Sequence, residues 1–438
     1  MGRVGERPFP PGEYDVVVVG TGPGGLQTSH FLSRFGVDHA VVSADDGPGG
    51  MFRAWPIFGR LLSRSKPDAP APPGSREYER YDHNSLIAGE ADLGALVPGE
   101  MDRSYATPSR EEMLRGLARF AEASGIVARY GCRWEDTSRD ADGRLVLTTT
   151  DGAYTCGAAV FALGVTTPWR PDVPGLEDVP HYADTAEPSF YRAKRVGIIG
   201  KRNSGFELAS GLLPWAREIV LISPRAVRTD VLARSTVNVR YFEPLEEHSF
   251  GGGTFAIDAA VEGIERTAGG YRIHLDGTHG AGELTIDCDE AIAATGFTTP
   301  FNDLLDLGVK AVARGRIPAL TPFFEANGAP GVFFAGNASQ GAFGLRKDSS
   351  YPMSTAVLGF RYNARLLAME LARRFDGRPP TPVPIARSDV AKLLCGELAS
   401  SPELWIQKGY LARVITIEAD DALDQGVLPL EHVLDSMG

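Results

Sequence analysis

Short continuous apolar runs recur along this chain, and each is bounded by glycine or polar residues. Runs of this kind are typical of strands that are buried on both faces of a parallel sheet. They predict strands at residues 15–20, 40–43, 158–163, 195–200, 218–223, 290–295 and 331–335. Helical periodicity predicts helices at residues 22–34, 108–123, 204–213 and 351–375, and Ser109 is the expected N-cap of the second. The fold class is therefore α/β.

The strand–helix–strand pattern occurs twice, and its two starts lie roughly 180 residues apart. After each start, alternating apolar and polar positions predict a small antiparallel meander, at about residues 126–155 and 253–288. We therefore expect two Rossmann-like dinucleotide-binding domains. Residues 50–105 show little periodicity and are interpreted as a functional loop, whereas residues 387–438 are interpreted as a small, mostly helical C-terminal tail.

The first start carries a glycine-rich loop between its strand and its helix. Its residues are Gly20, Gly22, Pro23, Gly24 and Gly25, which match the pattern G-x-G-x-x-G. The first glycine makes a tight turn, the second lets the backbone approach a pyrophosphate, and the last lets the helix pack closely. The helix N-terminus adds partial positive charge. This loop predicts a bound dinucleotide.

The position that usually holds the ribose hydroxyls of the dinucleotide is Ser43, which is not an acid. Asp45 and Asp46 follow directly and either take over this contact or only begin a turn. Farther along, Gly50 and Met51, after Gly49, would let the chain pass beside a flat ring system. Next come Arg53 and Trp55, which offer a charge and a stacking face, unless the whole segment is a simple loop turn.

The second start carries a variant of the same loop, formed by Gly200, Arg202, Asn203, Ser204 and Gly205. Arg202 replaces the middle glycine, so its side chain either crowds a pyrophosphate or contacts it through the guanidinium.

The strand after this second loop ends near Arg225 and Arg228, with no acid at the position that would select NAD. An arginine there accommodates the 2′-phosphate of NADP, so NADPH is favoured. Either arginine could instead be an ordinary surface residue.

Composition excludes several classes of protein. The net charge of −12 argues against nucleic acid or an anionic membrane surface as the main partner. No apolar stretch reaches the length of a membrane span, and no signal peptide is recognised, so we expect a cytoplasmic protein. The four cysteines are scattered, which gives neither a CxxC pair nor a zinc-like spacing, and no metal is expected.

Together these motifs resemble the flavin-containing monooxygenases and the wider group of thioredoxin-reductase-like flavoproteins. The similarity covers about residues 14–375. It implies FAD at the first glycine loop and NADPH at the second. It also implies a discontinuous FAD domain at residues 1–165 and 295–375, an inserted NADPH domain at 166–294, and a C-terminal helical extension at 376–438.

The resemblance also assigns residues outside the two glycine loops. Gly164 and Gly296 belong to the two segments where the chain would cross between the domains. Gly336 and Asn337 match a late FAD motif, in which Asn337 replaces an acid that usually holds the ribityl chain. His181 is all that remains of a fingerprint of the oxygenating branches, and a lone histidine is more often structural. The bacillithiol-disulfide reductases are similar too, so the subfamily stays open.

Without a thiol pair, a dithiol reductase of the usual type is excluded. The favoured hypothesis is an NADPH-reduced monooxygenase that uses a flavin (hydro)peroxide and O2 on a small organic substrate. One alternative is an NADPH-dependent flavin reductase of a disulfide, quinone or similar acceptor. Another is a non-catalytic FAD-binding protein with a degenerate NADPH site, which the departures at Ser43, Arg202 and Asn337 suggest.

No catalytic residue is assigned. Polar side chains that could shape the wall of the site or border the flavin are Arg60, Arg64, Lys66, Arg76, Gln340, Arg346 and Lys347. Each of them could equally be a solvated surface residue. In the tail, Trp405, Tyr410 and Leu411 are expected as anchors, which either cap the active site, form a homodimer or pack onto their own domain.

Overall fold

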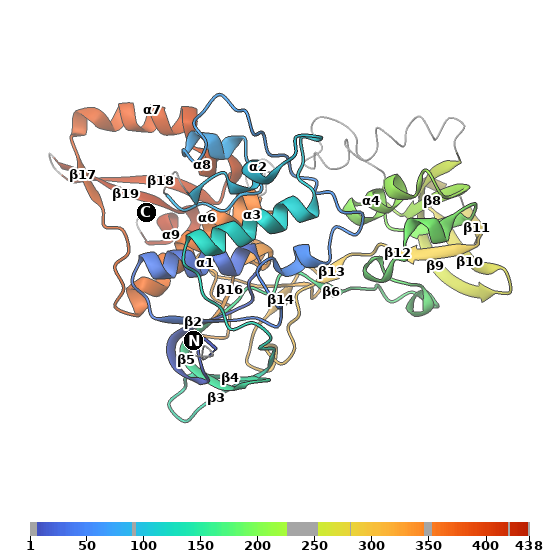
Figure 1. Ribbon diagram of the computed structural model, residues 1–438, viewed down its shortest axis with the longest axis horizontal. Coiled ribbons are helices and arrows are strands. Elements are labelled where there is room, and N and C mark those ends of the chain that lie inside the picture. Colours follow the sequence, from blue (N-terminus) through green and yellow to red (C-terminus); the bar gives the residue numbers. More distant parts are fainter. Residues whose placement is uncertain are drawn as a thin grey trace, which may run out of the picture. The chain divides into compact units, whose positions relative to one another are not determined.

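The computed structural model describes residues 7–89, 93–225, 253–280, 282–345, 353–418 and 421–436 (Figure 1). The chain forms two compact units. The first contains residues 1–54, 63–166 and 299–438, and the second contains residues 55–62 and 167–298. Residues 55–62 thus group with the second unit, and residues 376–438 group with the first unit instead of forming a unit of their own.

The first unit is built on a six-stranded sheet with the order β2-β1-β5-β4-β3, in which β16 pairs with the far end of β5. Strands β1, β2, β5 and β16 run parallel, whereas β3 and β4 are antiparallel. The bounds are β1 Gly12–Val19, β2 His39–Val42, β3 Trp134–Arg139, β4 Leu145–Thr149, β5 Gly152–Phe161 and β16 Val332–Phe334.

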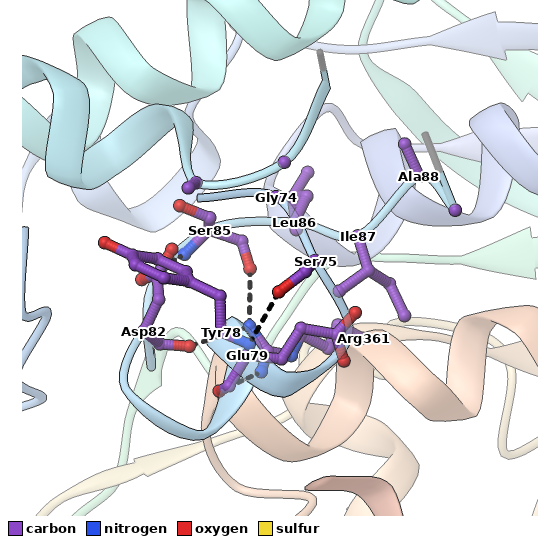
Figure 2. Close-up of a pocket in the computed structure, with 13 residues that line it drawn as sticks. Gly74, Ser75, Tyr78, Glu79, Asp82, Ser85, Leu86, Ile87, Ala88 and Arg361 are labelled. Carbon is purple, nitrogen blue, oxygen red and sulfur yellow. Dashed lines mark hydrogen bonds between the residues drawn. The ribbon is translucent and has the colours of Figure 1, made fainter. Parts of the chain in front are cut away.

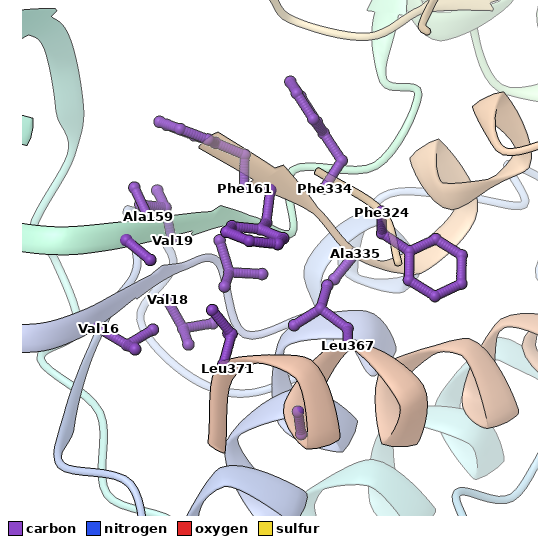
Figure 3. Packing of buried hydrophobic residues seen from close by; sticks show 14 of the residues in the cluster. Val16, Val18, Val19, Ala159, Phe161, Phe324, Phe334, Ala335, Leu367 and Leu371 are labelled. Carbon is purple, nitrogen blue, oxygen red and sulfur yellow. The ribbon is translucent and has the colours of Figure 1, made fainter. Parts of the chain in front are cut away.

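Helices α1 (Pro23–Arg34) and α6 (Val357–Arg374) pack against each other beside this sheet. Figure 3 shows Val18 of β1 next to Leu371 of α6, and both side chains are fully buried. The remaining helices and strands of this unit before the tail are α2 Leu96–Glu100, α3 Arg110–Ala123, β14 Ala311–Val312 and β15 Ile317–Pro318. Ser109 is the N-cap of α3 as predicted, and it forms a reciprocal capping box with Glu112.

Two element predictions in this unit were wrong. The end of the meander and the strand expected at 158–163 are one continuous strand, β5. Gly157, between them, does not turn the chain: it leaves room for the Phe375 ring, which would lie 2.6 Å from an added Cβ. The long helix begins only at Val357, because residues 353–356 form a turn in which the Ala356 N–H donates to the Met353 carbonyl.

The second unit contains a sheet with the order β11-β10-β9-β8-β7-β12. Strands β12, β7, β8 and the start of β9 run parallel, and β9, β10 and β11 form the predicted antiparallel meander. The bounds are β6 Thr167–Pro168, β7 Arg195–Ile199, α4 Asn203–Leu212, β8 Glu218–Ser223, β9 Thr254–Thr267, β10 Gly270–Gly277, β11 Gly282–Cys288, β12 Glu290–Ala293 and β13 Phe297–Thr298.

The C-terminal tail is not mostly helical. It carries a three-stranded antiparallel sheet with the order β17-β19-β18, formed by Val383–Ile385, Asp421–Pro429 and Leu411–Glu418. Helices α7 (Val390–Ser400), α8 (Pro402–Ile406) and α9 (Leu430–Ser436) accompany it. The β-branched run Val414–Ile417 favours this sheet over a helix. Of the predicted anchors, Tyr410 and Leu411 are buried, whereas Trp405 is 50% exposed.

No helix in the described part of the chain combines the length and the apolar character that crossing a membrane requires.

An ion cluster joins the C-terminal tail to Arg76, which lies in the long irregular segment at residues 50–105. The Arg76 guanidinium donates to both oxygens of Glu397 at 2.7 Å and to Glu403 at 3.0 Å. Burial works to raise the pKa of Glu403, but the charges of Arg76 and Arg365 outweigh it and hold that pKa below its usual value. Arg76 is therefore a structural contact between loop and tail.

We predict that Arg76→Ala lowers the free energy of unfolding by about 2 kcal/mol near pH 7, because two buried carboxylates lose their partner. A carboxyl whose pKa is lowered by folding stabilises the native state above its unfolded pKa and loses that contribution as pH falls. The deficit of the variant should therefore be largest near pH 7 and shrink as the pH falls below about 4.3, the unfolded pKa of a glutamate. Urea unfolding at several pH values measures it.

The matched control is Arg144→Ala, because Arg144 pairs with Glu13, whose side chain is 72% exposed. That change should cost less than about 1 kcal/mol. Equal losses in the two variants would show that Arg76 contributes no more than a surface pair.

Candidate cofactor-binding site

The first glycine loop joins β1 to α1 through two positions that admit no side chain. Gly20 has φ +108°, and an added Cβ would lie 2.7 Å from the Ala162 carbonyl oxygen at the end of β5. At Gly25 an added Cβ would lie 1.9 Å from the Gly20 carbonyl oxygen. The last glycine thus lets α1 begin directly against the end of β1, as the sequence predicts.

Two of the other glycines let separate segments of the chain meet backbone to backbone. An added Cβ at Gly24 would lie 2.4 Å from the Gly336 Cα atom, and one at Gly50 would lie 2.7 Å from the Gly22 Cα atom. At Gly22, by contrast, a Cβ would make only an ordinary contact of 3.6 Å with Gly50. Packing therefore explains glycine at 24 and 50 but not at 22, where the close approach of a pyrophosphate would explain it.

Two further observations fit FAD at this site. No side chain caps the N-terminus of α1, so its first-turn N–H groups can serve an anion. Within the described residues, the Oδ1 atom of Asn337 is buried and has no hydrogen-bond partner. Asn337 lies in the 3-10 helix η8 (Gly336–Gly341), whose first residue meets Gly24. The Oδ1 atom therefore lies near the contact between Gly24 and Gly336 and lacks a donor. A ribityl hydroxyl could supply that donor.

The structure separates the two aspartates after β2. Ser43 is buried, accepts a hydrogen bond from the Thr21 hydroxyl at 3.0 Å, and donates to the Asp45 carboxylate at 3.3 Å. Asp46 is exposed and forms an ion pair with Arg53. Asp45 is thus held at the carboxyl end of β2, where a ribose would be bound, whereas Asp46 and Arg53 occupy each other.

The segment after Gly50 is only partly arranged as expected. Gly50 and Met51 begin a short 3-10 helix, η1 (Gly50–Arg53), in the first unit. Trp55 groups instead with the second unit, where its ring packs on Phe297 at a centroid distance of 4.9 Å. Its expected role beside the flavin stays a prediction.

The second glycine loop repeats the geometry of the first. Gly200 has φ +131°, and an added Cβ would lie 2.3 Å from the Ala294 carbonyl oxygen. At Gly205 an added Cβ would lie 2.2 Å from the Gly200 carbonyl oxygen. Arg202 is the exposed N-cap of α4, with an extended backbone, and Asn203 and Ser204 form its first turn. The replacement of glycine by Arg202 therefore leaves the loop intact.

Sequence reasoning missed Lys201, the residue after Gly200. Its side chain is buried, and its Nζ donates to the Ile257 carbonyl at 2.7 Å and pairs with Asp258 at β9. Burial lowers the pKa of Lys201. Thr21 occupies the equivalent position in the first loop, directly after Gly20. A position-by-position comparison of the two loops would have drawn attention to Lys201.

The basic residues expected around the nucleotide have different outcomes. Arg225 is exposed just beyond the end of β8, a position open to a 2′-phosphate. Arg228, Arg346 and Lys347 lie outside the described residues.

His181 is a structural residue. It is fully buried, its Nδ1 accepts from the Ala183 N–H at 3.2 Å, and its Nε2 lies 3.0 Å from the Gly296 carbonyl oxygen. Nε2 must therefore carry the proton and donate it. Burial lowers the pKa of His181, which keeps the ring neutral. The histidine thus fastens the second crossover segment, where Gly296 lies.

The long irregular segment is braced by Arg361, a fully buried residue of α6 that sequence reasoning also missed. Its guanidinium donates to the carbonyl oxygens of Asp82, Ser85 and Glu79, each at 2.9 Å. Figure 2 shows Arg361 among these residues at the edge of a small pocket. A buried arginine bound mainly by backbone carbonyls fixes the course of a loop that has no regular structure of its own.

None of the four cysteines, all of which lie in the described residues, forms a disulfide. Cys132, Cys156 and Cys288 are buried, and Cys395 is exposed. Burial raises the pKa of Cys156 to about 12 and that of Cys288 to about 11. Because the thiolate is the reactive form, these two thiols are inert.

Three features of the structure agree with one family: the close backbone contacts at Gly24 and Gly50, the two similar glycine loops, and the two six-stranded sheets. Residues 17–336 match the family described as "Pyridine nucleotide-disulphide oxidoreductase". The chain belongs to this family. Membership implies FAD and a pyridine nucleotide as cofactors and confirms the fold class. It also confirms the resemblance to thioredoxin-reductase-like and monooxygenase-like flavoproteins.

Among similar proteins is a zebrafish (Danio rerio) "FAD-dependent oxidoreductase domain-containing protein 2", 26% identical over 85% of this chain. This chain spans only 61% of that relative. A "Ferredoxin--NADP reductase" of Salinispora tropica is 29% identical over 75% of this chain and 87% of its own length.

Two solved structures share the fold over 83% of this chain and 99% of their own. One is a bacillithiol disulfide reductase of Staphylococcus aureus, with 16% identity and a TM-score of 0.63. The other is a flavin-containing monooxygenase of Stenotrophomonas maltophilia, with 21% identity and a TM-score of 0.60.

A pair of glycine substitutions separates cofactor contact from loop packing. Gly22→Ala should leave the apoprotein within about 1 kcal/mol of the wild type and weaken FAD binding by at least about tenfold, because the methyl group enters the space of the pyrophosphate. Gly24→Ala should also destabilise the apoprotein, by about 2 kcal/mol or more, since backbone must move. Urea unfolding and quenching of FAD fluorescence measure both. Unchanged FAD affinity in Gly22→Ala would place the pyrophosphate elsewhere.

Proposed function

We propose that this protein is an FAD-dependent oxidoreductase that takes electrons from NADPH and transfers them directly to a diffusible acceptor. The favoured reaction is monooxygenation of a small organic substrate. The observation that carries the proposal is the state of the four cysteines, which provide no pair that could accept electrons from the flavin.

The thiols argue against a dithiol relay on two grounds. Two of the buried thiols have strongly raised pKa values, so they are not thiolates near neutral pH. The exposed Cys395 lies alone in α7 of the tail. FAD, when bound, would supply hydride and electron chemistry, and the chain supplies the glycine cradle and the Asn337 acceptor that hold it.

The packed irregular segment favours oxygenation over simple electron transfer. Tyr78, Leu86, Ile87 and Val97 from this segment are all buried, so the segment is packed, as a wall of the site would have to be. A site walled off from water protects reactive oxygen chemistry from hydrolysis and leakage. One of the structural neighbours is itself named a flavin-containing monooxygenase.

A reductase is the second candidate. It is favoured by the relative named a ferredoxin–NADP reductase, which aligns over most of its own length. Its acceptor would be a disulfide, a quinone or a similar compound that diffuses to the flavin. A protein with a degenerate nucleotide site is the third, because Arg202 stands where the first loop has Gly22.

Anaerobic mixing of the flavin-loaded protein with NADPH, followed by air, tests the proposal. We expect NADPH to bleach the visible flavin absorbance, and isotopically labelled O2 to be incorporated into a product from a panel of small organic substrates. Oxygen-independent NADPH oxidation with an added quinone or disulfide would favour the reductase instead. Flavin that NADPH cannot bleach would contradict both enzymes and favour the degenerate site.

The choice of nicotinamide cofactor gives a second test. Arg225→Ala should raise the KM for NADPH by about tenfold and change the KM for NADH by less than about twofold, because a guanidinium binds the 2′-phosphate that only NADPH carries. Arg217→Ala is the control, since Arg217 is an exposed arginine just before β8, at the opposite end of that strand. Equal effects on both cofactors would remove Arg225 from phosphate recognition.

A further inference from the structure

The C-terminal tail lies beyond the residues that match the family, yet it inserts a polar side chain into the core of the first unit. Gln407 follows α8, which packs on α6 (Figure 1). The Gln407 side chain is fully buried. It meets Asn363 of α6 and Ser354, and Asn363 in turn meets Ser339. These three residues are at most 2% exposed. These four side chains come from four separate segments of the chain.

The hydrogen bonds between them run in one direction. The Gln407 Nε2 group donates to the Asn363 Oδ1 atom at 2.6 Å. The Asn363 Nδ2 group then donates to the Ser339 hydroxyl oxygen at 2.8 Å and to Ser354 at 3.0 Å. Because Asn363 can accept only at Oδ1, the Gln407 amide fixes which way the Asn363 amide points. The tail thereby sets the donor that Ser339 receives.

A second contact holds the other end of the same segment. The Gly409 carbonyl accepts from the Leu345 N–H at 2.9 Å. An added Cβ at Gly344 would lie 2.7 Å from the Tyr410 ring. The fully buried Tyr410 in turn donates its hydroxyl to the Pro322 carbonyl at 2.7 Å. Residues 407–410 therefore fasten the chain from Ser339 to Leu345.

The fastened segment is the one that would hold the flavin. Its 3-10 helix η8 carries Gly336, which meets Gly24, and Asn337, whose buried Oδ1 atom has no partner among the described residues. Ser339 lies only two residues beyond Asn337. A shift of Ser339 would therefore move the acceptor that we assign to the ribityl chain.

The polar character of Gln407 itself requires an explanation. Within the described residues its Oε1 atom is buried without a hydrogen-bond partner, which is unfavourable. A methionine of similar size would fill the space without that penalty. What glutamine adds is an Nε2 group with two N–H donors. One donates to Asn363 at 2.6 Å, and the other lies within reach of Ser354 and the Gly359 carbonyl, both at 3.1 Å.

We propose that Gln407, acting through Asn363 on Ser339, is a positioning residue for the flavin. The tail holds η8 in the geometry that FAD requires before FAD binds, so flavin affinity depends on a residue that does not touch the cofactor. This inference rests on the proposed function, because it takes FAD as the occupant.

The test compares Gln407→Met with a control in the same tail. Gln425→Met removes a glutamine whose amide donates to Thr416 at 2.9 Å within the tail sheet, away from η8. We expect Gln407→Met to weaken FAD binding by about tenfold, the effect of one lost hydrogen bond. It should also alter the visible circular dichroism of the bound flavin. The control should bind FAD as the wild type does, even where urea unfolding shows lower stability.

Ser339→Ala keeps the inference testable if Gln407→Met does not fold, because it removes only the acceptor at the η8 end. It should weaken FAD binding by a similar factor, and the double variant by about tenfold instead of about a hundredfold, since both changes break one relay. Wild-type FAD affinity and an unchanged flavin spectrum in Gln407→Met or Ser339→Ala would overturn the inference alone. A wild-type protein that takes up no FAD would overturn the proposed function and the inference together.

Discussion

The first unit depends on a place where three segments of the chain cross with no side chain between them. Gly24 at the start of α1 meets Gly336 of η8, and Gly50 of η1 meets Gly22. Because the backbones are this close, the strand or helix next to each glycine segment must fix the position of that segment accurately. The first glycine loop follows β1, and η8 follows β16, a strand of the same sheet. Asn363 of α6 also holds η8 through its hydrogen bond to Ser339. The crossing therefore links the folding of distant segments to the shape of one binding site.

Most of the sheet could be predicted because its strands are buried on both faces. Such strands need continuous apolar runs, which is why Val16–Val19 and Glu218–Ser223 were located to within a few residues. The tail sheet could not be predicted in the same way. Along its strand Leu411–Glu418, buried and partly exposed residues do not alternate, so the pattern is weak. The length of β5 was missed because the end of the meander and the strand at 158–163 were predicted as separate elements. Gly157 instead continues the strand and leaves room for Phe375.

In the candidate site, features set by local contacts were predictable from the sequence, whereas features set by distant contacts were not. The glycine loops were predictable because a strand, a turn and a helix lie within a few residues of one another. The different partners of Asp45 and Asp46 were not predictable, because they depend on how Ser43 and Arg53 are placed. Arg361 and Gln407 left no local signal, since their partners lie far away in the sequence. Long-range polar contacts of buried side chains are what a single sequence reveals least.

A comparison of the two glycine loops shows which positions folding requires to be glycine and which position is free to vary with function. In both loops the first and last glycines are required, because an added Cβ would meet a carbonyl oxygen at 2.7 Å or less. The middle position has no such demand: Gly22 would tolerate a Cβ in ordinary contact, and Arg202 has an extended backbone that any residue adopts. Folding of the second unit therefore places no constraint on residue 202. We therefore expect any effect of residue 202 on phosphate binding to come from its exposed guanidinium, through charge and paired hydrogen bonds, and not from the stability of the loop.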